Sequence, residues 1–200
     1  GLANLTRLTI YATDVVFIAL LGETPLAAAS LATALFGQMV WTFSGLTGAV
    51  APLVAAELGR RQHAVREVRR SVRMALWLAM ACAVLGLAVC QAGEAIMLAT
   101  GQQPAVAAAA GQFLLVLGWS MFPQVASNVL RIFVSALGRP VFATGIMAMA
   151  IVVNAVGNYA LMFGLFGLPA MGLSGWAVAT LITSCATCLG CCAVIRCDKR

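Results

Sequence analysis

Residues 57–92 read ELGRRQHAVREVRRSVR followed by MALWLAMACAVLGLAVCQA, an arginine-rich segment joined directly to an apolar run. The apolar part has about the 20 residues that an α-helix needs to cross the hydrocarbon core of a bilayer. A change from basic to apolar sequence is typical of a membrane span that begins at the cytoplasmic surface. This stretch therefore predicts a transmembrane helix and gives its direction.

The composition of the whole chain also indicates a membrane protein. Of its 200 residues, 62% are hydrophobic and 9% are charged, and the mean hydropathy is +1.00. Soluble domains are about half apolar and about a quarter charged. A chain of this length cannot bury so much apolar surface in a core of its own, so lipid must cover the rest.

Apolar runs separated by turn or charge signals predict an all-α, polytopic membrane helix bundle with six transmembrane helices. The predicted spans are residues 5–22, 27–57, 71–92, 106–137, 141–165 and 171–195. The second and fourth are longer than a bilayer requires, and Pro52 and Pro123 are candidate kinks in them. A short interfacial helix is expected over residues 94–100.

The basic residues fit one side of this arrangement. Arginines crowd residues 60–73, Arg139 lies between the fourth and fifth spans, and residues 196–200 add three more basic side chains. The alternate connections contain no lysine or arginine. The positive-inside rule then places the basic side and both termini in the cytoplasm. Topology explains the net charge of +6, so nucleic-acid binding is not expected.

Four polar residues are candidates for a site within the membrane, where such groups are costly. Asp14 is the only acidic residue well inside a span, Asn154 and Asn158 lie one turn apart, and Thr180 lies on the last span. At a rise of 1.5 Å per residue, all four lie roughly 9 to 15 Å from the outer ends of their spans. If the helices adjoin, these oxygens suit Na⁺, and a desolvated carboxylate alone suits H⁺.

Simpler roles remain open for the same residues. The asparagines and Thr180 are also suited to hydrogen bonds between helices, and Thr180 can bond its own backbone. Asp14 can also lie at a helix end and extend outward. Four further amides either line a cavity or simply pack: Gln38, Gln112, Gln124 and Asn128. Arg131 either extends to the cytoplasmic headgroups or closes a gate through a salt bridge.

The cysteines near the end of the chain have a spacing similar to that of metal ligands. Cys185, Cys188, Cys191 and Cys192 lie within one apolar span, but no histidine accompanies them. Cluster ligation usually needs a loop rather than a regular helix. We therefore predict small-residue packing, with no metal and no cofactor other than the coupling ion. The sequence also lacks nucleophile and nucleotide-binding motifs, so it is not predicted to be an enzyme.

Several segments in order along the chain resemble one transporter family. They are residues 14–22 (DVVFIALLG), 26–33 (LAAASLAT), 51–59 (APLVAAELG), 100–104 (TGQQP), 130–140 (LRIFVSALGRP), 154–164 (NAVGNYALMFG) and 175–180 (GWAVAT). This ordered set is similar to the N-terminal lobe of the multidrug and toxic compound extrusion (MATE) transporters, most like the NorM-type branch. The resemblance covers nearly all 200 residues, although no single motif is diagnostic.

The resemblance implies a fold of twelve helices in two lobes, of which residues 1–200 supply the first and the C-terminal lobe is absent. It implies Na⁺- or H⁺-coupled export of amphipathic, often cationic compounds by alternating access. Family residues for coupling match Asp14, Asn154, Asn158 and Thr180. Some relatives carry aspartate where this chain has Asn158, which leaves the choice of ion open. The partners implied are a small-molecule substrate, membrane lipid and the missing lobe.

Three other functions remain as alternatives. A related fold flips lipid-linked precursors, but such proteins usually line the cavity with basic groups, which are not found at mid-membrane here. A membrane enzyme or redox protein would use the cysteines. A non-transporting membrane subunit would pair with a partner half.

Overall fold

The computed structural model describes residues 12, 15–16, 18–49, 51–52, 56, 64–136, 140–164 and 171–197. Within this part of the chain the secondary structure is helical, with no strand. The helices are α2 (Glu23–Gly48), α4 (Ala64–Gln91), α5 (Gly93–Ala99), α6 (Pro104–Leu117), the 3₁₀ turn η1 (Gly118–Ser120), α7 (Met121–Ala136), α8 (Pro140–Phe163) and α9 (Leu173–Cys197). The predicted all-α bundle is confirmed.

Among the residues that the structure describes, five segments are long and apolar enough to cross a membrane. They are Glu23–Gly48, Val68–Gln91, Pro104–Ser135, Thr144–Phe163 and Leu173–Arg196. They correspond to five of the six predicted spans, while most of the first predicted span, 5–22, lies outside the described residues. The short helix predicted over residues 94–100 is confirmed as α5.

Two helices begin earlier in the sequence than the predicted membrane spans. Helix α2 begins at Glu23 rather than residue 27, because Pro25 lies in the first turn, where no amide proton is needed. Gly22, with φ of 120°, precedes it, and the amide of Leu26 donates to the Gly22 carbonyl at 3.2 Å. Helix α4 begins at Ala64 rather than residue 71, so much of the basic segment is helical and continues the span beyond the membrane.

The predicted interruption near Pro123 coincides with a change of helix type. Between α6 and α7 the backbone forms η1, and Pro123 lies in the following turn. A proline removes the hydrogen bond to the carbonyl four residues earlier, which favours such a local change. The region around Pro52 lies mostly outside the described residues.

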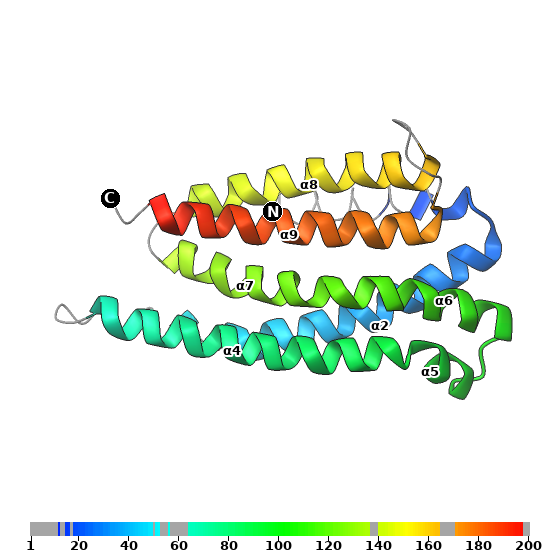
Figure 1. Cartoon of the computed structure of the whole chain (residues 1–200), viewed down its shortest axis with the longest axis horizontal. Coiled ribbons are helices and arrows are strands. Elements are labelled where there is room, and N and C mark those ends of the chain that lie inside the picture. The colour runs from blue at the N-terminus through cyan, green and yellow to red at the C-terminus, as the bar shows by residue number, and fades with distance from the viewer. Residues whose placement is uncertain are drawn as a thin grey trace.

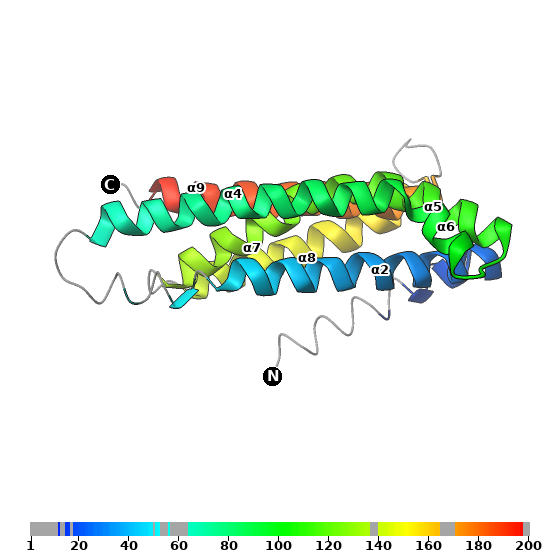
Figure 2. The same ribbon diagram turned by 90° about the horizontal axis from the view of Figure 1, so that it is seen from below.

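Helix α7 is the centre of the bundle. Figures 1 and 2 show α2, α4, α8 and α9 around it, and it contacts all four. In Pro104–Ser135, which contains α6 and α7, half of the most apolar stretch is buried inside the bundle. The corresponding share in Leu173–Arg196 of α9 is 17%. The outer surfaces carry large exposed apolar side chains, among them Trp41, Trp77 and Leu189. This distribution is expected when lipid, rather than water, surrounds the bundle.

The starts of α4 and α8 and the ends of α7 and α9 lie at one end of the bundle (Figure 1). Helix α5 and the beginning of α6 lie at the other end. The arginines of α4 and Arg196 of α9 are therefore on the same side. This agrees with the predicted separation of basic and neutral connections.

Candidate functional site

Helices α8 and α9 approach each other closely at small residues. A Cβ atom on Gly175 would lie 2.6 Å from the Leu161 carbonyl oxygen, and one on Gly157 would lie 3.3 Å from the Ala179 Cβ. Two helices this close bring short polar side chains within hydrogen-bond distance of each other. The interface therefore positions the asparagines of α8 against α9.

Asn154 and Asn158 form a chain of hydrogen bonds that reaches α9. The Asn158 amide donates to Asn154 Oδ1 at 3.1 Å, and the Asn154 amide donates to Thr183 Oγ1 at 3.5 Å. Asn158 is fully buried (0% exposed). The prediction that the two asparagines share one helix face is confirmed, and that face points toward α9.

Thr183, rather than Thr180, supplies the hydroxyl that contacts Asn154. The Thr180 hydroxyl donates to the Trp176 carbonyl of its own helix at 3.0 Å, and Thr183 likewise bonds the Ala179 carbonyl at 2.8 Å. Thr180 is half-buried beside this cluster. Its role in coupling stays a prediction. Sequence reasoning missed Thr183, although its spacing of three residues from Thr180 places both on neighbouring parts of one face.

A second polar contact joins α9 to the central helix. The Ser184 hydroxyl lies 2.9 Å from Gln124 Oε1 and 2.8 Å from the Thr180 carbonyl oxygen, and its one proton serves these two acceptors. Thr183 and Ser184 are consecutive, so one turn of α9 contacts α8 on one side and α7 on the other. We call the side chains of Gln124, Asn154, Asn158, Thr183 and Ser184 the polar layer.

Of the other polar residues named from the sequence, Asn128 and Arg131 bond each other and Gln38 is exposed. Asn128 lies one turn after Gln124 and accepts a hydrogen bond from Arg131 Nη2 at 2.8 Å, while Arg131 Nη1 lies 3.4 Å from the Met147 sulfur of α8. Arg131 is thus held inside the bundle between α7 and α8. Gln38 is exposed on α2. Asp14 lies outside the described residues.

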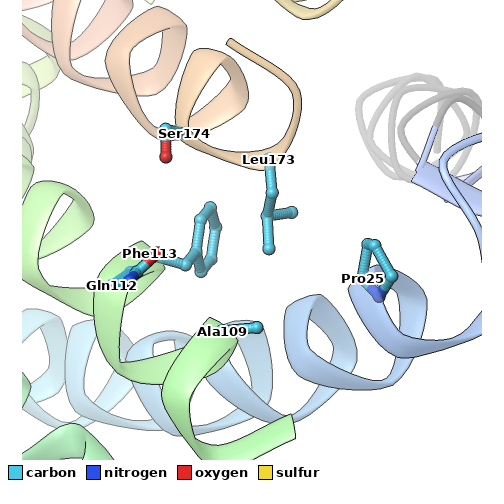
Figure 3. A pocket seen from close by; sticks show the side chains of 6 residues that line it. All are labelled: Pro25, Ala109, Gln112, Phe113, Leu173 and Ser174. Carbon is cyan, nitrogen blue, oxygen red and sulfur yellow. The ribbon is translucent and has the colours of Figure 1, made fainter. Parts of the chain in front are cut away.

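A small cavity opens toward the end of the bundle near α5. Its volume is about 110 Å³, and Figure 3 shows its lining by Pro25, Ala109, Gln112, Phe113, Leu173 and Ser174. Phe113 also stacks on Trp176, with ring centroids 5.2 Å apart. Trp176 lies about two turns of α9 from Thr183 in the polar layer. Gln112, one of the four amides named from the sequence, lies at this cavity.

Three cysteines of α9 take part in helix packing, while Cys185 is exposed. Cys191 is 1% exposed and belongs to an apolar cluster with Leu130 and Ile146, and Cys188 and Cys192 pack against that cluster. Their small size allows α7, α8 and α9 to approach one another.

We expect replacement of Thr183 by valine to weaken the polar layer more than the same change at Thr180. Valine has the shape of threonine without its hydroxyl, and only Thr183 contacts Asn154. Interhelical hydrogen bonds in membranes average about 0.6 kcal/mol. Unfolding titrations of the purified full-length protein in sodium dodecyl sulfate should show about this difference between the variants. Equal free energies of unfolding would contradict the assignment.

Comparison with known proteins identifies the family. The MatE family model matches residues 1–160. The chain belongs to the MatE family. It is 41% identical over 199 residues to a probable multidrug resistance protein NorM of Mesorhizobium japonicum, and 38% identical over 187 residues to that of Brucella suis. These alignments cover 100% and 94% of this chain but only 43% and 40% of the two relatives.

Solved structures show the same fold. A MOP superfamily transporter from Pyrococcus furiosus matches 95% of this chain with a TM-score of 0.83 at 20% identity. A structure described as MATE in the bent conformation matches 93% of it with a TM-score of 0.80 at 21% identity. The chain covers 41% and 40% of those two proteins. It therefore corresponds to one part of a larger multi-pass membrane transporter fold.

Proposed function

We propose that this chain is the N-terminal half of a cation-coupled antiporter that exports amphipathic, often cationic compounds by alternating access. The observation that carries the proposal is the polar layer, in which amide and hydroxyl oxygens from three helices meet inside an otherwise apolar bundle. The multidrug resistance names of its relatives support the substrate class. The ends of α4 and α9 that carry arginine face the cytoplasm in this proposal, across a bacterial inner membrane.

The chemistry of the polar layer favours a small hard cation. Such ions are coordinated by oxygen ligands, including the neutral oxygens of amides and hydroxyls, and Asp14 would add the negative charge. For Na⁺, Asn154, Asn158 and the threonine hydroxyls would share the coordination with Asp14. For H⁺, Asp14 alone would carry the proton, and the amides would hold its position. Binding at this layer would then favour release of the substrate outward.

The substrate path in this proposal lies toward the absent half. Gln38 is exposed on α2, and Gln124 and Asn128 are half-buried in α7. Together they would line the cavity between the two halves. These three side chains are neutral, and the Arg131 guanidinium beside them is engaged by Asn128 at 2.8 Å. Such a lining suits amphipathic cations better than the pyrophosphate of lipid-linked precursors, which favours basic groups.

The test is dye efflux from cells that express the complete reading frame, under an imposed Na⁺ gradient or an imposed pH gradient. We expect one gradient to drive efflux, and Asn158→Leu to slow it at least tenfold, because leucine keeps the volume and removes both polar atoms. Gln91→Leu, an exposed amide at the end of α4, is the matched control and should keep the wild-type rate. An efflux rate that changes with neither the Na⁺ gradient nor the pH gradient would contradict ion coupling.

A further inference from the structure

Helix α4 has one buried face and one exposed face along its whole described length. Val68, Val72, Ala75, Ala79 and Ala83 are each at most 8% exposed. They recur at intervals of three and four residues, so they form one stripe. This stripe packs against α2, α6 and α7.

The opposite face carries three exposed arginines and a tryptophan. Arg69, Arg70 and Arg73 are exposed, and Trp77 is 72% exposed one turn after Arg73. The spacings of three and four residues place these side chains next to one another on the helix surface. We call them the arginine–tryptophan stripe. Exposed Met74, Val84 and Leu85 extend the same side of α4 as an apolar surface.

The length of α4 places the arginines at the membrane boundary. A hydrocarbon core of about 30 Å takes about 20 helical residues at 1.5 Å each. Counted back from Gln91 at the end of α4, the boundary falls near Ser71. Arg69, Arg70 and Arg73 therefore lie at the level of the lipid headgroups, and Trp77 lies about 6 Å deeper than Arg73. Tryptophan is enriched at this interface.

The charge of this segment is unbalanced. The sequence of α4 contains four arginines, residues 66, 69, 70 and 73, and one carboxylate, Glu67. Guanidinium groups bind phosphate oxygens through two parallel hydrogen bonds, and an adjacent tryptophan packs on the upper acyl chain. Each basic residue near an anionic membrane surface contributes about a fivefold increase in affinity.

We propose that the arginine–tryptophan stripe is a binding site for the phosphate headgroup of an anionic phospholipid in the leaflet on that side of the membrane. The lipid would hold the cytoplasmic end of α4 in place through Arg69, Arg70 and Arg73 while its chains cover Trp77. This site lies on the outside of the bundle and is separate from the polar layer.

The test uses purified full-length protein in vesicles and lipids with brominated chains, which quench nearby tryptophan. The difference between wild type and Trp77→Phe isolates the signal of Trp77 from those of the other tryptophans. We expect phosphatidylglycerol to associate at Trp77 at least about fivefold more strongly than phosphatidylcholine. The combined variant Arg69→Gln, Arg70→Gln, Arg73→Gln should lower this ratio to about one. Arg196→Gln, an exposed arginine on the same side in α9, is the matched control and should keep it.

Three results would overturn the proposal: a ratio near one in the wild type, a triple variant with the wild-type ratio, or displacement of the lipid by inorganic phosphate at constant ionic strength. The last would show a site for free anions. If the triple variant fails to insert, Arg73→Gln decides, with a ratio below that of the wild type expected and an unchanged ratio counting against the site. Because the readout is lipid association, it is independent of efflux.

Discussion

Asp14→Asn is expected to reduce ion-driven dye efflux by the full-length protein to the level of cells without it. Asparagine keeps the size of the side chain and one oxygen, but it carries no negative charge and takes up no proton. A Na⁺ site would lose its compensating charge, and an H⁺ site would lose the titrating group, so the prediction holds for either ion. The measurement is the initial efflux rate under the active gradient, with the amount of protein in the membrane fraction measured in parallel.

The matched control is Glu23→Gln, the same change of carboxylate to amide at an exposed position in the first turn of α2. This variant should export dye at the wild-type rate. Efflux by Asp14→Asn at the wild-type rate would show that the Asp14 carboxylate is not needed for ion coupling. Equal losses in both variants would indicate a general effect of charge on insertion.

Gly175→Val is expected to disrupt the packing of α8 on α9. The nearest atoms to a Cβ at this position are the carbonyl oxygen and carbon of Leu161, at 2.6 and 2.8 Å, and the amide nitrogen of Met162, at 3.1 Å. These are backbone atoms of α8, so no side-chain rotation relieves the contact. The Leu161 carbonyl also accepts a hydrogen bond from the Met171 amide at 3.1 Å, and separation of the helices would strain that contact.

Overpacking of this kind costs about 1–3 kcal/mol, and valine adds two methyl groups beyond the Cβ. We expect the thermal midpoint of purified protein to fall by at least about 5 °C, with less protein in the membrane. Gly145→Val is the control, because Gly145 lies on α8, the helix against which Gly175 packs, and nothing lies within 4 Å of a Cβ there. Equal midpoints for the two variants would show that the close approach is not required.

Local features of the sequence were sufficient for much of the fold. Apolar runs gave the spans, and turn signals gave the short helix that became α5. The helical period of 3.6 residues placed Asn154 and Asn158 on one face. Helices α2 and α4 begin before the predicted spans. Pro25 fits the first turn of α2, and the arginines before residue 71 continue α4, because both are compatible with helix.

The partners of each polar side chain depended on tertiary structure. The hydrophobicity of α9 is nearly even around the helix, and Thr180, Thr183 and Ser184 lie on neighbouring parts of one face. The sequence therefore does not indicate which of these hydroxyls meets α7 and which meets α8. The rotation and depth of α9 are set by close contacts at Gly157 and Gly175 with residues of the facing helix. Those contacts bring Thr183 rather than Thr180 to Asn154, and Ser184 to Gln124. The sequence by itself predicted that polar groups lie at one depth in the membrane, because depth follows from counting residues along each helix. Only the packing of the helices decided which of these groups touch, because contact depends on the rotation of each helix against its neighbours.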